Sequence, residues 1–133
     1  MMSGVFISMR LSHPFADAGR LCRNLGFEPK REWLAGQPKQ TPKGMVLEGV
    51  YSSSYCACEL PLDQATDLEE GLQLAIEALK PRTDVLNRFS QDGGKISIFV
   101  SLEKGFFGGA QLTPHMLAQL AALHVFLEID RNF

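Results

Sequence analysis

The chain lacks long apolar runs, a strong excess of one charge and a cysteine framework. None of its apolar runs approaches the ~18 residues needed to cross a bilayer, so no membrane association is expected. The net charge of −2 argues against nucleic acid as a partner, because dedicated nucleic-acid binders normally carry a basic excess. Three cysteines form an odd set that suits a disulfide scaffold poorly. No signal peptide pattern is visible at the N-terminus, and a cytoplasmic location fits best.

The remaining composition is that of an ordinary globular domain. The 133 residues are 45% hydrophobic and 21% charged. A chain of this length buries enough surface to form a core without disulfides or metals. We therefore expect a single α+β domain over residues 1–133.

Two similar strand–helix–strand patterns lie near the two ends of the chain. The first comprises an alternating stretch Val5–Ser12, a helical stretch Pro14–Leu25 and an extended stretch Phe27–Trp33. The second comprises Ile96–Leu102, a helix from Thr113-Pro114 to about Leu123, and Val125–Asp130. Two such β-α-β units predict a ferredoxin-like two-layer sandwich, in which one largely antiparallel sheet carries its helices on one face.

The middle of the chain predicts a loop, a hairpin and two helices. The stretch Leu34–Gly44, rich in proline and glycine, is expected to be a mobile loop. Met45–Tyr51 and Tyr55–Leu60 are expected to pair as a hairpin. Thr66 is expected to cap a helix that ends at Pro81, and a short helix is expected to follow it.

Several short motifs resemble those of a known family. They are Leu25-Gly26-Phe27-Glu28-Pro29 followed by Trp33 and Gly36, Leu79-Lys80-Pro81, Leu112-Thr113-Pro114, Leu117, Leu120-Ala121 and Leu127-Glu128-Ile129-Asp130. Together they resemble domain-of-unknown-function family 4279, with Tyr51 at a position where the family often has tryptophan. The resemblance implies a small bacterial α+β domain and implies no activity.

No pattern in the chain predicts a catalytic, metal or cofactor site. Cys56 and Cys58 share one face of a strand, and we expect both to pack in the core rather than to act as reactive thiolates. His13, His115 and His124 all fall near predicted helix ends, where surface positions are expected.

The loop around Phe106 and Phe107 is the most unusual local feature. Glycines flank the two phenylalanines just before a predicted helix. The loop allows three interpretations: a partner-binding loop, a phosphate cradle, or a cover over the edge of the core. The Walker and dinucleotide patterns are both absent.

A second apolar sheet face is the feature that best indicates function. Phe6, Phe99 and Phe126 are expected to share it, together with Arg10 and Glu128. A second subunit, a ligand, or the chain's own segment Leu34–Gly44 would cover such a face. Arg10 is expected to form an ion pair with Glu128 or Asp130.

Three hypotheses about function follow, in order of preference. The first is a non-catalytic module that binds a protein partner or a second copy of itself through this face. The second is a small-molecule sensor with a pocket between the face and the Phe106-Phe107 loop. The third is a small enzyme, with Glu128 and Asp130 as the candidate acids and Arg10 opposite them.

Overall fold

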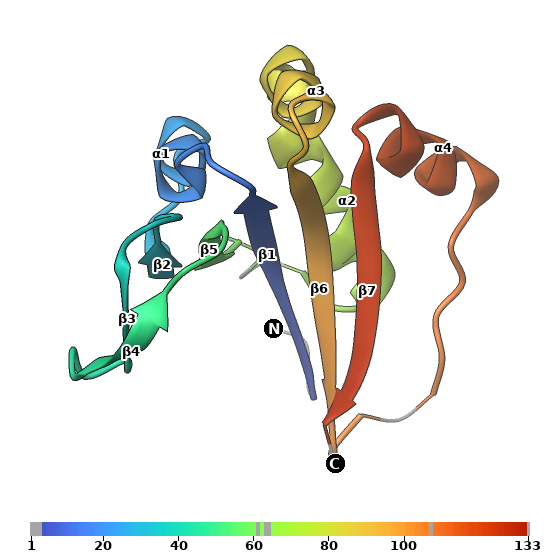
Figure 1. The fold of residues 1–133 in the computed structure, drawn as a ribbon. Coiled ribbons are helices and arrows are strands. Elements are labelled where there is room, and N and C mark those ends of the chain that lie inside the picture. The colour runs from blue at the N-terminus through green and yellow to red at the C-terminus, as the bar shows by residue number, and fades with distance from the viewer. Residues whose placement is uncertain (1–3, 61, 63–64, 107, 133) are drawn as a thin grey trace.

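A computed structural model describes residues 4–60, 62, 65–106 and 108–132. Its main feature is a five-stranded, mostly antiparallel sheet with the strand order β2-β5-β1-β6-β7 (Figure 1). The strands are β1 (Val5–His13), β2 (Pro29–Trp33), β5 (Ser54–Glu59), β6 (Lys95–Glu103) and β7 (Val125–Asn132). The α+β class, the largely antiparallel sheet and the presence of β1 and β6 in this one sheet are thereby confirmed, and the two strands are direct antiparallel neighbours.

The two predicted strand–helix–strand units, β1–α1–β2 and β6–α4–β7, are paired differently in the sheet. Strand β7 pairs directly with β6 and runs parallel to it. Strand β2 does not touch β1, because β5 lies between them and pairs antiparallel with both. The predicted duplication therefore holds for the order of the elements and for their place in one sheet, but the strands of the two units are paired differently.

The core lies against one face of this sheet. Alternate residues of β1, including Met9 and Leu11, are buried beside Ile96 and Ile98 of β6. The helices that contribute to the same core are α1 (Ala18–Asn24), α2 (Leu68–Leu79), α3 (Thr83–Gln91) and α4 (Pro114–Ala122), with a 3-10 turn at Lys80–Arg82. Among the described residues, no helix is both long and apolar enough to cross a membrane.

The helix starts correct two predictions made from capping residues. Helix α1 begins at Ala18 rather than Pro14, because the Asp17 carboxylate accepts the Arg20 N–H and acts as the cap. Helix α2 is capped by Asp67, which accepts the Glu70 N–H, while Thr66 bonds to the Glu70 side chain. Thr113 caps α4 as predicted.

The predicted mobile loop contains a strand. Within residues 34–44, β3 (Pro38–Gln40) pairs antiparallel with β4 (Val46–Val50) in a separate two-stranded sheet. The hairpin predicted between β4 and the following strand is therefore wrong, since β5 pairs with β1 and β2 instead. The β3–β4 hairpin extends from the β2 edge of the main sheet (Figure 1).

Candidate binding surface

The second face of the main sheet, here called the open face, is formed by alternate residues of each strand. It comprises the even-numbered residues 6–12 of β1, residues 31 and 33 of β2, the odd-numbered residues 55–59 of β5 and 95–101 of β6, and the even-numbered residues 126–130 of β7. Phe6, Arg10, Phe99, Phe126 and Glu128 all belong to it, so the structure brings together the five sheet residues predicted from the sequence.

The phenylalanines of the open face are largely uncovered. Phe6 is 59% exposed and Phe126 is 55% exposed, while Phe99 is partly buried between them. The Arg10 guanidinium carbon lies 3.6 Å from the centre of the Phe99 ring, a cation–π contact. Segment 34–44, which forms part of the hairpin beyond β2, leaves both exposed rings uncovered.

Glu128 forms a polar network with β6 rather than the predicted pair with Arg10. Its Oε1 atom accepts from Lys95 Nζ at 3.0 Å and from Ser97 Oγ at 2.9 Å. The hydrogen bonds from Lys95 and Ser97 lower the pKa of this carboxyl, and desolvation opposes them. A carboxylate held ionised in this way is a poor proton donor at neutral pH. The side chain of Lys95 also lies 4.8 Å from the Phe126 ring centre.

A stack of three aromatic rings at the β2 end of the open face was not predicted. The Trp33 ring stacks on Tyr51 at 4.6 Å and on Tyr55 at 4.5 Å between centroids. The Arg31 guanidinium carbon lies 5.0 Å from the Trp33 ring centre. Tyr51 also donates its hydroxyl to the Gln40 carbonyl and accepts the Gln40 N–H, so the stack joins the hairpin to the main sheet.

Two concave regions adjoin these groups. One of about 500 Å³ lies beside Phe6 and Arg10 and is also lined by Ala57, Leu60 and Leu62. The other, of about 440 Å³, lies between β2 and the hairpin. Its lining includes Arg31, Trp33 and Tyr51. Both are open rather than enclosed, and Lys30, which forms an ion pair with Glu59, borders both.

The predicted aromatic loop is only partly described. Phe106 is partly buried and packs against the core, and its N–H bonds to the Glu103 carbonyl. Phe107 lies outside the described residues. Because Phe106 covers the core, the described part of this loop fits the interpretation of a cover over the core edge.

His13 is buried, in contrast to the predicted surface position. It is 1% exposed, and its Nδ1 atom accepts the backbone N–H groups of Phe15 at 3.1 Å and Ala16 at 2.9 Å. Its ring lies 4.5 Å from the Phe15 ring and 4.9 Å from the Phe89 ring. His13 therefore shapes the turn between β1 and α1, which explains why the helix does not begin at Pro14. His115 and His124 are exposed, as predicted.

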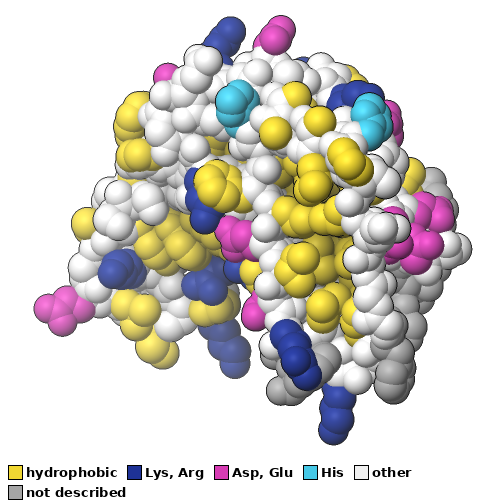
Figure 2. Space-filling model, turned by 90° about the vertical axis from the view of Figure 1, so that its right-hand side faces the viewer, with side chains coloured by type: hydrophobic (Ala, Val, Ile, Leu, Met, Phe, Trp, Pro, Cys, Tyr) yellow, Lys and Arg dark blue, Asp and Glu magenta, His cyan; other side chains and the backbone are white. Residues whose placement is uncertain are grey.

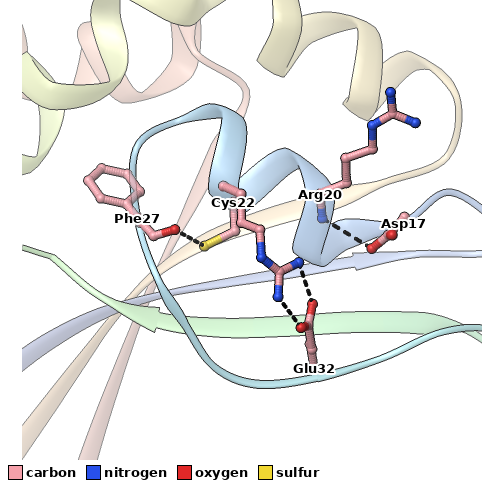
Figure 3. A network of polar contacts seen from close by, with 6 residues as sticks. Asp17, Arg20, Cys22, Phe27 and Glu32 are labelled. Carbon is pink, nitrogen blue, oxygen red and sulfur yellow. Dashed lines mark hydrogen bonds and ion pairs between the residues drawn. The ribbon is translucent and has the colours of Figure 1, made fainter.

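All three cysteines are buried in the core, as predicted for Cys56 and Cys58. Cys22, Cys56 and Cys58 are free thiols with at most 1% exposure. Cys22 donates to the Phe27 carbonyl at the end of α1 (Figure 3). Burial raises the pKa of the Cys56 and Cys58 thiols, and the nearby Cys22 raises both further. Such thiols are protonated and poorly nucleophilic at neutral pH.

The described residues include no group of three or more histidine, cysteine, aspartate or glutamate side chains arranged to hold a metal ion. Comparisons of the chain with protein-family models, with curated proteins and with solved structures gave no match. The candidate site therefore rests on the geometry of the open face alone.

Proposed function

We propose that this protein is a non-catalytic binding module that contacts a protein partner through the open face. The observation that carries the proposal is the pair of exposed rings, Phe6 and Phe126, on either side of the Arg10–Phe99 contact. Aromatic residues and arginine are the side chains most enriched at the energetic centres of protein interfaces.

The exposed apolar area is large enough to favour binding. A fully buried phenylalanine removes about 200 Å² from water, and more than half of that area remains open on Phe6 and Phe126. Covering the exposed part of one such ring would contribute about 3 kcal/mol, before the entropy of association is subtracted, and each of the two rings offers this amount.

Phe99→Asp is expected to weaken binding through the open face by about tenfold or more. The new carboxylate would lie beside the Arg10 guanidinium, so the fold should persist while the apolar centre of the surface is lost. The measurement is capture of partners from extracts of the host cells by wild-type and variant protein, with melting temperatures recorded for both.

Phe15→Asp is the matched control, because Phe15 is 72% exposed in the turn after β1, outside the open face. A partner that is retained by the wild type and by the Phe15 variant, and lost with the Phe99 variant, supports the proposal. Equal retention by all three proteins would refute it. If Phe99→Asp instead halves the mass of a dimer, the partner on this face is a second copy of the chain.

A small-molecule sensor is the second candidate function, favoured by the 500 Å³ concavity beside Phe6 and Arg10. Its volume falls in the range of ligand sites, and its lining combines apolar side chains with a few charged groups. Stabilisation of the protein against heat by one class of metabolite, lost in Arg10→Ala, would favour this function over a protein partner.

We also propose a ferredoxin-like two-layer fold for the sheet and its helices. The support is a pair of interleaved crossovers: β1–α1–β2 passes over β5, and β5–α2–β6 passes over β1. In this proposed fold the second β-α-β unit runs from β5 through α2 and α3 to β6, and the predicted C-terminal unit, β6–α4–β7, is an additional one whose strands pair in parallel. Helix α4 and strand β7 then extend this arrangement at one edge.

Membership in domain-of-unknown-function family 4279, with a bacterial source and a cytoplasmic location, is a further proposal. The support is that several of the motif residues shape a turn, cap a helix or stack on another ring in this structure. Gly26 has a φ of +90° just after α1, Thr113 caps α4, and Tyr51, where the family often has tryptophan, stacks on Trp33. These contacts explain why such residue types are needed at these positions.

A further inference from the structure

Strand β7 leaves one edge of the main sheet unpaired. It is eight residues long, lies at the end of the strand order and pairs only with β6 among the described strands. An edge strand presents a row of backbone N–H and C=O groups that can pair with another chain, here along residues 125–129.

The helix side of this edge is apolar and uncovered. Ile129 is 56% exposed, although its parallel neighbour Val100 on β6 is fully buried. Leu117 on α4 is 49% exposed, and Leu112 and Leu127 are only partly buried. Strand alternation and helical spacing are both typical of core positions at Ile129 and Leu117, yet the two side chains are exposed. Figure 2, which looks at the molecule from the right-hand side of Figure 1, shows hydrophobic side chains gathered in the middle of this surface.

We propose that β7 pairs antiparallel with β7 of a second copy of this chain, about a two-fold axis at Leu127. Such pairing continues the sheet across the dimer and brings the two apolar patches together on the helix side. The contact involves the strand edge and is therefore separate from the contact proposed for the open face.

The charges on β7 select the register of this pairing. Residues opposite each other must point to the same side of the joined sheet, so the two residue numbers of each pair sum to an even number. An axis at residue 128 would place Glu128 opposite the partner's Glu128, and an axis at residue 129 would place it opposite the partner's Asp130. Like charges directly opposite each other are destabilising.

An axis at Leu127 avoids both repulsions. It places Leu127 opposite the partner's Leu127 and Val125 opposite the partner's Ile129, all on the apolar side. On the open-face side, Phe126 lies opposite the partner's Glu128, and Asp130 lies opposite no residue of the partner's β7 strand. An axis at Phe126 would also avoid repulsion, but it would pair only three residues of β7 with each other.

The joined sheet has a consequence for the proposed function. The two-fold axis is perpendicular to the sheet, so the open faces of both subunits lie on the same side. Phe126 becomes a diagonal neighbour of the partner's Phe126, at a spacing of roughly 7–8 Å that aromatic side chains can bridge. The dimer therefore presents one continuous, doubled surface to a protein partner.

The test combines the mass in solution with disulfide cross-linking. Light scattering of the full chain should give twice the monomer mass of 14.7 kDa. Under mild oxidation, Leu127→Cys should form a covalent dimer, because opposite Cα atoms in an antiparallel pair lie about 4.5–5.5 Å apart, within disulfide range. The native cysteines are buried and should not interfere.

Ile129→Cys is the matched control, since it lies on the same side of β7 two residues away and faces the partner's Val125. It should stay uncross-linked alone and should cross-link when mixed with Val125→Cys. A monomeric wild type overturns the proposal, as does stronger self-linking by Ile129→Cys than by Leu127→Cys. Phe99→Asp should leave the dimer mass unchanged, so failure of the edge pairing is distinguishable from failure of the open-face contact.

Discussion

His13→Ala is expected to lower the free energy of unfolding by about 3 kcal/mol, the larger of the two stability effects that we predict. The imidazole is buried, and its Nδ1 atom is the acceptor for two backbone N–H groups. Alanine would leave both donors without this partner and would open a cavity between the turn and the Phe89 ring. Chemical denaturation followed by circular dichroism measures the loss.

Two control variants show whether the loss of stability comes from the missing hydrogen-bond acceptor and from the buried position of His13. His13→Asn supplies a side-chain oxygen close to the position of Nδ1, so it should recover part of the lost stability. His115→Ala removes an exposed imidazole from the first turn of α4 and should change stability by about 0.5 kcal/mol or less. Equal losses for His13→Ala and His115→Ala would contradict the structural role of His13.

Trp33→Ala is expected to release the β3–β4 hairpin from the main sheet. Trp33 stacks on both tyrosines, and Tyr51 in turn is hydrogen-bonded to Gln40 of β3. Only the Trp33–Tyr51 pair links the hairpin to the main sheet, and an aromatic pair contributes about 1 kcal/mol beyond burial. Amide hydrogen exchange in residues 38–50 should then become roughly fivefold faster, since 1.4 kcal/mol corresponds to about tenfold.

The matched variant is Trp33→Phe, which keeps a ring for stacking and should preserve most of the protection. Exchange in β6, which lies between β1 and β7 in the sheet, serves as an internal reference, because its residues 96–98 are buried. Unchanged exchange of the hairpin in Trp33→Ala would show that the stack does not anchor it.

Side-chain alternation was sufficient to predict which residues share a sheet face. It placed Phe6, Phe99 and Phe126 together, and the strand register confirms that they lie on one face. Alternation contains no information about which strand edges pair. For that reason, the partner of β4 was predicted wrongly and the position of β5 between β1 and β2 was missed.

The sequence also did not predict how much of the sheet the helices cover. Ile129 alternates like a core residue, but the helices do not cover the end of β7, so it is exposed. Phe15 fits a helical stripe, but the turn made by His13 places it outside the helix. Trp33 stands in a mostly polar strand, and its stacking partner Tyr51 comes from a hairpin whose pairing was not predicted.

Side-chain footprinting of the open face tests the central claim most directly. The protein is exposed to hydroxyl radicals both as a purified sample and within extracts of its host cells, and oxidation at each phenylalanine is measured by mass spectrometry. We predict that Phe6 and Phe126, which are 59% and 55% exposed in the structure, become protected in the extract. Phe15, which is 72% exposed outside the open face, should be oxidised equally in both samples. Equal oxidation of all three rings in both samples would contradict the claim that the open face is a contact surface.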